Sequence, residues 1–171
     1  ITSKDAVKFI ENHSSLAATI TVHHLLANRN IMLSKGIRPN FYCAPILKTE
    51  DDRCALVKAA VSGKRNFFLG TDSAPHVERK KISSCGCAGI FSSPLAIPLL
   101  IQLFEEHDSI SKIENFVSIN GRKFYGIKQQ KETVNYVKRT TPVQTIKNVD
   151  TSEGKVVIFN PIKNLYWEEL C

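Results

Sequence analysis

The chain has 171 residues, and its 23 Lys and Arg against 16 Asp and Glu give a formal net charge of +7. This length fits one domain, and a hydrophobic content of 43% supports a packed core, which excludes a disordered or fibrous chain. No apolar stretch reaches the roughly 18 residues that a membrane span needs, and charges interrupt the first ten positions, so we expect no membrane partner and no signal peptide.

The composition also limits the partners and the location of the protein. The positive charges are scattered and only 8% of residues are aromatic, so we expect no nucleic-acid partner. Five cysteines make an odd number without regular spacing, which favours free thiols in the cytoplasm. Cys85 and Cys87 are separated by one residue and no second pair exists, so they do not predict a structural zinc site.

Two buried strands are predicted in the first 70 residues. The apolar runs at residues 16–21 (LAATIT) and 66–70 (NFFLG) lack alternating polarity, which is typical of parallel strands covered on both faces. A helix over residues 3–12, with Ser3 or Thr2 as its N-cap, precedes the first strand.

Three further elements are expected between these strands. Residues 23–30 predict a helical turn, and residues 40–44 predict a short extended segment. Thr49 begins a clear helix that Gly63 ends, and acidic residues in its first turn complement the helix dipole. We expect three residues to form its inward face: Cys54, Val57 and Val61.

A long polar loop is predicted over residues 71–91, and a loop of that length is either functional or disordered. Ser93 and Pro94 then open a helix. Pro98 should make that helix bend or begin late, because proline cannot donate a backbone hydrogen bond.

The remaining residues predict less regular structure. Ser111 and Glu114 have the spacing of a capping box, which predicts a short helix over residues 112–117. Beyond Gly126 we expect an extended and irregular tail, in which β-branched residues cluster in two segments: 133–139 and 155–159.

Helices that alternate with buried strands are typical of a parallel α/β sheet. Only two or three such strands are present, whereas a (β/α)₈ barrel takes about 250 residues. The fold class is therefore α/β, and we predict the last strands and helices of a TIM barrel followed by an irregular C-terminal tail.

The strongest chemical signal is the segment FFLGTDSAPH at residues 67–76. Asp72 follows the carboxyl end of a buried strand, where barrels build their active sites, so it is a candidate metal ligand or proton shuttle. Asp72 is equally suited to an Asx turn before Ser73 and Pro75. On local spacing alone, His76 is more typical of a surface histidine.

Four other histidines carry weaker signals. His23 and His24 are adjacent and should point in different directions, so at most one of them would face a site. Packing or helix capping is the expected role for both, while His13 and His107 are expected on the surface.

Several stretches closely resemble those of the bacterial class II dihydroorotases. The resemblance is carried by ITSKDA (1–6), LAATIT (16–21), NRN (28–30), RPNFYCAPILK (38–48), FLGTDSAPH (68–76), SSCGCAG (83–89) and FEEH…INGRKFYGI (104–127). It is weaker through the tail. FLGTDSAPH and SSCGCAG together are highly specific.

That resemblance implies an amidohydrolase with two zinc ions on a (β/α)₈ barrel. The family reversibly cyclises N-carbamoyl-L-aspartate to dihydroorotate in pyrimidine biosynthesis. By the resemblance, Asp72 is a metal ligand and the proton shuttle, and His76 binds the substrate carboxylate. Ala44 and Ala88 make main-chain contacts to the substrate, although Ala44 replaces a leucine that is common in relatives.

The other metal ligands of the family, including an H-x-H pair and a modified lysine, have no counterpart in this chain. We therefore expect a C-terminal portion that is inactive without the N-terminal portion of the same enzyme, and a homodimer when complete. Residues 1–127 would form the end of the barrel, and residues 128–171 an extension that packs on it. The alternative is a non-catalytic amidohydrolase-like fragment that packs on a full-length partner.

Overall fold

A computed structural model of the chain describes residues 1–34, 36–129 and 131–170. The strands β1 (Ala18–Ile20) and β2 (Phe67–Leu69) form a parallel pair, with Thr19 opposite Phe68. Both lie inside the predicted apolar runs, so the expectation of an α/β fold is confirmed. Within the described residues this sheet is open rather than a closed barrel, and each strand has one edge without a strand partner.

Four helices surround β1 in sequence. They are α1 (Lys4–Glu11), α2 (Val22–Leu26), α3 (Arg29–Leu33) and α4 (Glu50–Val61). The predicted cap of α1 is confirmed, since the Ser3 hydroxyl accepts from the N–H of Ala6 at 3.2 Å. The single turn predicted over residues 23–30 is instead two short helices, because Asn28 caps α3 by accepting from the N–H of Asn30.

Helix α4 begins with the expected cap, but its buried face is broader than predicted. Thr49 and Asp52 form a capping box, in which each side chain accepts from the other residue's N–H. Cys54 and Val61 are only half-buried. Because α4 packs against α1, α2 and β2, the buried side chains are Leu56, Val57, Ala59 and Ala60.

The extended segment predicted over residues 40–44 is wrong at its start. Pro39 opens a 3₁₀ helix, η1 (Pro39–Phe41), because its ring fixes φ at a helical value. Phe41 is buried there, and the Arg38 guanidinium lies 4.4 Å from the centre of its ring.

Several helices follow β2 along the chain. They are α5 (Glu78–Lys81), η2 (Ser93–Leu95), α6 (Ala96–Glu106), η3 (Ile110–Lys112), the π-helical turn η4 (Asn115–Ile119) and α7 (Asn120–Tyr125). As predicted, the main helix begins late, and Pro98 lies in its first turn. The capping box of Ser111 and Glu114 is wrong, because Ser111 lies inside η3 instead of preceding a helix.

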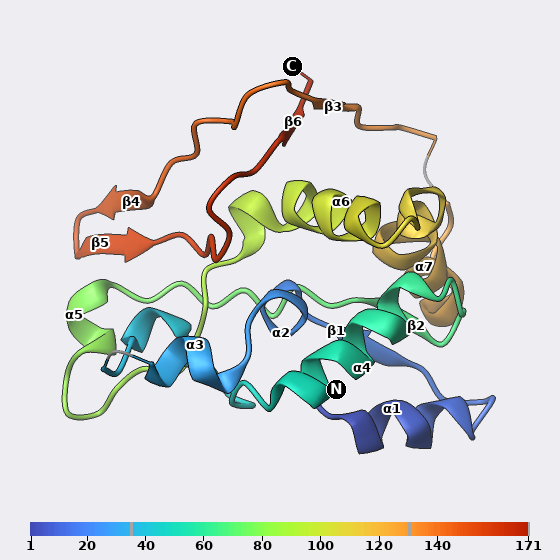
Figure 1. Cartoon of the computed structure of the whole chain (residues 1–171), viewed down its shortest axis with the longest axis horizontal. Coiled ribbons are helices and arrows are strands. Elements are labelled where there is room, and N and C mark those ends of the chain that lie inside the picture. The colour runs from blue at the N-terminus through green and yellow to red at the C-terminus, as the bar shows by residue number, and fades with distance from the viewer. Residues whose placement is uncertain (35, 130, 171) are drawn as a thin grey trace.

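The tail is more regular than predicted. β3 (Tyr136–Lys138) pairs antiparallel with β6 (Trp167–Glu169), and β4 (Asn148–Thr151) pairs antiparallel with β5 (Gly154–Val157). Figure 1 shows the tail running along α6, on the side opposite α1 and α4. The Trp167 indole N–H donates to a Glu105 carboxylate oxygen at 3.1 Å, which fixes β6 to this helix.

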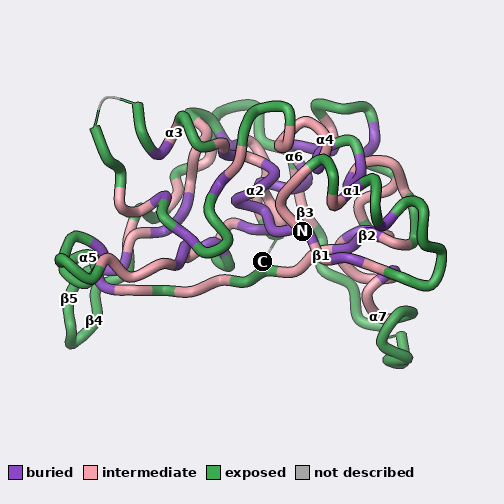
Figure 2. The backbone as a smooth tube through the Cα atoms, turned by 90° about the horizontal axis from the view of Figure 1, so that it is seen from below, coloured by how far each residue is buried: buried purple, intermediate pink, exposed green. Residues whose placement is uncertain are grey.

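The core runs through the middle of these layers, as the burial colours of Figure 2 show. Its most deeply buried side chains come from the strands, α2, α4, α6 and η4, and from two loops: Ile20, Leu25, Leu47, Leu56, Phe67, Ile90, Leu100, Phe104 and Phe116. None of the described helices has the length and apolar character that crossing a membrane requires.

Candidate active site

Asp72 stands beyond the carboxyl end of β2. Gly70 precedes it, and a Cβ at Gly70 would lie 2.6 Å from Thr19 Cβ, so glycine allows β1 and β2 to lie close together. Asp72 is exposed and has a φ of 42°, a left-handed conformation that aspartate tolerates better than most residues. The Asx turn is not formed, because the Ala74 N–H donates to the Ile90 carbonyl at 3.0 Å.

The carboxylate of Asp72 makes no hydrogen bond or ion pair with any residue in the described part of the chain. Its charge acts on the amino group of Ile1. Burial lowers the pKa of that amino group, and the negative charge of Asp72 opposes the shift. The same amino group donates to the Thr19 carbonyl at 2.8 Å. Asp72 thus lies near β1 with both oxygens available to a ligand.

His76 and Ala88 are brought into direct contact. The half-buried His76 donates from Nε2 to the Ala88 carbonyl at 3.2 Å, which leaves Nδ1 for a ligand. The imidazole lies against Gly89, where a Cβ would come within 2.7 Å of His76 Cδ2 and of the Ala74 carbonyl oxygen. Only glycine at position 89 leaves room for this arrangement.

A buried lysine connects the two loops that carry Ala44 and Ala88. Lys81 is 7% exposed, and its ammonium donates to the carbonyls of Tyr42 at 3.1 Å, Cys87 at 3.0 Å and Gly89 at 2.5 Å. All three of its N–H donors are therefore used. We call this arrangement the Lys81 clamp. Burial lowers the pKa of Lys81, and the nearby Cys43 and Cys87 oppose this shift.

Sequence reasoning missed Lys81 because it lies at the end of the exposed run Arg79–Lys80. The loop predicted over residues 71–91 also contains α5, and its two ends are joined. Ser73 Oγ accepts from the N–H groups of Ser92 and Ser93, each at 3.1 Å. The loop is thus an ordered part of the site.

Within the described residues, hydrogen bonds link some of the predicted site residues and not others. His76 contacts Ala88, and the Lys81 clamp places the exposed Ala44 on a loop fixed beside Ala88. Asp72 makes no hydrogen bond with these three residues within the described ranges. It is positioned separately, by the end of β2.

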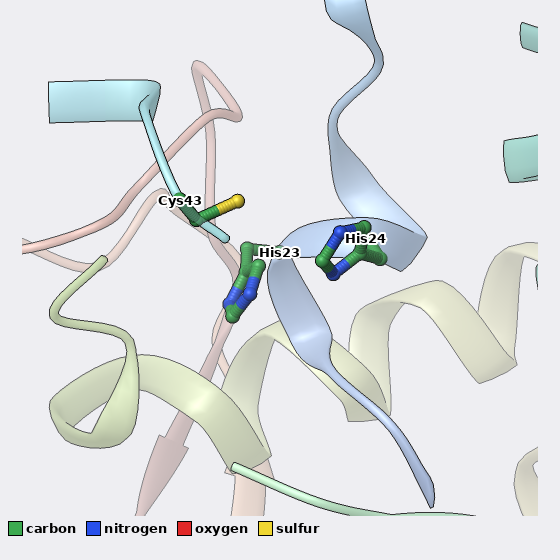
Figure 3. A group of neighbouring side chains, drawn as sticks. All are labelled: His23, His24 and Cys43. Atoms are coloured by element: carbon green, nitrogen blue, oxygen red, sulfur yellow. The ribbon is translucent and has the colours of Figure 1, made fainter. Parts of the chain in front are cut away.

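The two histidines after β1 lie closer together than predicted. His23 and His24 are both buried in α2, and their ring centres are only 4.8 Å apart (Figure 3). The prediction that they diverge is wrong, although the expected packing role fits their burial. Burial and the neighbouring His24 lower the pKa of His23 to about 3, and burial also lowers the pKa of His24. Helix α2 is capped by Thr21 and not by either imidazole.

The four cysteines within the described residues, Cys43, Cys54, Cys85 and Cys87, are free. Cys171, the fifth, lies outside these residues. Cys85 is exposed and Cys87 is half-buried, and neither belongs to a group of three potential metal ligands in the described ranges.

Comparison with known proteins places these features in a family context. The chain is 45% identical to a dihydroorotase of Sinorhizobium medicae over 168 residues, and 47% identical to that of Idiomarina loihiensis over 169 residues. Each alignment covers 98% of this chain, so it takes in most of the tail. The resemblance to dihydroorotases is confirmed. No protein-family model matches the chain.

Solved dihydroorotases share the fold. The Campylobacter jejuni dihydroorotase superposes with a TM-score of 0.87 at 29% identity, covering all of this chain and 49% of that one. A Saccharomyces cerevisiae dihydroorotase, solved in complex with 5-fluoroorotic acid, gives a TM-score of 0.80 at 31% identity over 99% of this chain and 50% of that one. The chain spans about half the length of the curated dihydroorotases that it matches.

Proposed function

We propose that this chain is the C-terminal portion of a zinc-dependent dihydroorotase, which reversibly cyclises N-carbamoyl-L-aspartate to dihydroorotate in pyrimidine biosynthesis. The identity of 43–47% to dihydroorotases along almost the whole chain carries the proposal. The position of Asp72 supports it, since (β/α)₈ enzymes act at the carboxyl ends of their strands. On the family resemblance alone, the proposal extends to a cytoplasmic homodimer.

Each site residue has a role that its surroundings support. In ring opening, the free carboxylate of Asp72 accepts a proton from the attacking water and passes it to the leaving ring nitrogen. His76 donates from Nδ1 to the substrate carboxylate while Nε2 stays bound to Ala88, which requires a proton on both ring nitrogens. The main chains of Ala44 and Ala88, held by the Lys81 clamp, orient the substrate.

Asp72 is also the residue of this chain that would hold the zinc of the proposed active site. When bound, zinc polarises the amide carbonyl and supplies hydroxide at neutral pH. The unpartnered carboxylate fits a ligand role, but one carboxylate cannot hold two ions. The group of three potential ligands in the described part of the chain does not include Asp72. The remaining ligands belong, in this proposal, to the N-terminal portion.

The sheet offers a surface for that N-terminal portion. β1 and β2 each have an edge without a strand partner in the described residues, and unpaired edges readily accept another strand. A hollow of about 630 Å³ opens beside them, lined in part by Thr19, Phe68 and Tyr125. We propose that residues 1–127 complete a barrel with the missing strands, and that residues 128–171 form an extension packed on it.

The proposal is tested by complementation. Dihydroorotate hydrolysis is measured for the chain alone, for the N-terminal portion of a relative alone, and for their mixture with zinc. We expect activity only in the mixture, because neither piece holds all of the ligands. A stable complex without activity would instead favour the alternative, a non-catalytic fragment that packs on a partner.

A further inference from the structure

A second group of potential metal ligands lies at the end of β1 and does not include Asp72. His23, His24 and Cys43 are all buried, and one ligand atom from each lies within 4.8 Å of the others (Figure 3). The two histidines come from α2, and Cys43 comes from the loop that follows η1. We call these three residues the His–His–Cys cluster.

His23 is the member whose bonding is incomplete. Its side chain is 3% exposed, and Nδ1 has no hydrogen-bond partner in the structure. Its ring meets Phe159 edge-on, with ring centres 6.3 Å apart, and so lies in an apolar wall on that side. A buried polar nitrogen without a partner is costly, and a ligand that accepts its lone pair removes that cost.

The other two members, His24 and Cys43, both donate a hydrogen bond to the same carbonyl oxygen. His24 Nε2 donates to the Pro45 carbonyl at 3.0 Å, and the Cys43 thiol donates to the same carbonyl at 3.3 Å. The other nitrogen of His24, Nδ1, lies 2.7 Å from the Thr21 hydroxyl. An oxygen partner on one imidazole nitrogen is the usual support for a histidine that ligates metal through the other.

We infer that the His–His–Cys cluster is a binding site for a single thiophilic divalent ion of the zinc class, separate from the centre proposed at Asp72. The ion is bound by Nδ1 of His23, by Nε2 of His24 and by the thiolate of Cys43. Nδ1 of His24 keeps its contact with the Thr21 hydroxyl. The Pro45 carbonyl, already beside two of the three, is a further oxygen donor at the cluster. Imidazole and thiolate are ligands that such ions prefer over oxygen.

Binding requires local changes in protonation, in hydrogen bonding and in the distances between the three ligands. The Cys43 thiol loses its proton to solvent as the sulfur–metal bond forms, and the thiol and imidazole release the Pro45 carbonyl. Zinc–nitrogen bonds of about 2.0 Å and zinc–sulfur bonds of about 2.3 Å place tetrahedral ligands within about 3.5 Å of one another, so the cluster closes by about 1.3 Å. The short helix α2 and the loop at Cys43 are the parts that would move.

The test is a titration of the full 171-residue chain with Co²⁺, followed by absorption. Thiolate ligation gives a charge-transfer band in the near ultraviolet, and we expect this band to saturate at one ion per chain. Cys43→Ala should abolish the band, and His23→Gln should weaken Co²⁺ binding by more than about a hundredfold, since loss of even a supporting partner costs ten- to a hundredfold. Circular dichroism checks that both variants keep their helical content.

Two control variants separate this site from other metal binding. Cys54→Ser removes a half-buried thiol outside the cluster, and Asp72→Asn removes the ligand of the other proposed centre; both should keep the band and its stoichiometry. Zinc should also raise the unfolding temperature of the wild-type chain and of both controls, but not that of Cys43→Ala. Absence of a thiolate band, or a band that survives Cys43→Ala, would overturn the inference.

Discussion

The carboxyl ends of β1 and β2 lie at the same edge of one parallel pair, yet they present opposite chemistry. After β1 the chain turns at Thr21 and buries His23 and His24. After β2 it leaves Asp72 exposed, in a left-handed conformation and without a partner. Neighbouring strand ends of one sheet can therefore carry a closed site and an open one.

The difference comes from the segments that cover each end. Phe159, from the tail, covers His23, and the Pro45 carbonyl accepts from His24. No hydrogen bond from the described part of the chain reaches the carboxylate of Asp72. The buried end is completed by this chain, whereas the open end suits ligands supplied by another chain.

Removing Asp72 should have the largest effect, because it takes away the proposed metal ligand and the proposed proton shuttle together. In the assembled enzyme, Asp72→Ala should lower kcat by at least about 10²–10⁴. Steady-state kinetics and zinc content of the same preparation measure this. A variant with full zinc occupancy and near-normal kcat would refute the role of Asp72.

The Lys81 clamp should stabilise the fold by holding together the two loops that carry Ala44 and Ala88. Lys81→Met leaves three carbonyls without their donor, and we expect the free energy of unfolding to fall by about 3 kcal/mol. KM in the assembled enzyme should rise as the loops of Ala44 and Ala88 loosen. Lys80→Met is the matched control.

Lys80 pairs with Glu153 on the exposed surface at 3.0 Å, so Lys80→Met should change the free energy of unfolding by less than about 0.5 kcal/mol. Urea unfolding monitored by Trp167 fluorescence compares the two variants. Equal effects on stability would mean that the ammonium of Lys81 is not the feature that holds these loops.

His76 should act on substrate binding more than on chemistry. His76→Asn removes the charge-assisted hydrogen bond proposed to the substrate carboxylate, worth roughly 1.5–3 kcal/mol, so KM should rise about ten- to a hundredfold with zinc content unchanged. Initial rates over a range of dihydroorotate concentrations separate KM from kcat. Unchanged kinetics would remove His76 from the site.

The smallest expected effect concerns the ion pair of Arg53 and Glu50, which lies at the surface beside α2. The Arg53 guanidinium donates to the Leu25 carbonyl and binds Glu50, holding the pKa of Glu50 at about 2, below its ordinary 4.5. Because the pKa is lowered by folding, this stabilisation is present above pH 4.5 and is lost as pH falls toward 2. Glu50 is half-exposed, so screening by solvent limits the contribution of this ion pair to the free energy of unfolding to about 0.5 kcal/mol.

Urea unfolding at several pH values between 6 and 3 tests this expectation. Glu50→Gln should lose less stability on acidification than the wild type. Asp51 lies in the same first turn of α4, but its side chain has no hydrogen-bond partner in the described residues. Asp51→Asn therefore controls for the loss of a negative charge beside the helix dipole. An identical acid response in the Glu50 and Asp51 variants would exclude the Arg53 contact as the cause.

Local sequence patterns predicted the features that depend on neighbouring residues. The buried strands followed from apolar runs, and the cap at Thr49 followed from the residues around it. Asp72 was found in the same way, because its position after a strand is visible in the sequence. The hydrogen bond between His76 and Ala88 was not visible, since no spacing encodes it.

Features that depend on distant segments were missed. Lys81 is buried only because Tyr42, from a separate loop, approaches Cys87 and Gly89. The proximity of Cys43 to the two histidines likewise requires the loop after η1 to return to α2. In the tail, β3 pairs with β6 across about thirty residues, so its order arises from contacts that local propensity cannot indicate.

In the proposed enzyme, the open end of β2 completes an active site whose other ligands lie in a separate portion. The most direct measurement titrates the N-terminal portion of a dihydroorotase with this chain in the presence of zinc, following dihydroorotate hydrolysis. We predict that activity rises from zero, saturates at one chain per N-terminal portion, and is not restored when the chain carries Asp72→Ala. Hydrolysis by this chain alone, or equal restoration by the Asp72 variant, would contradict the account.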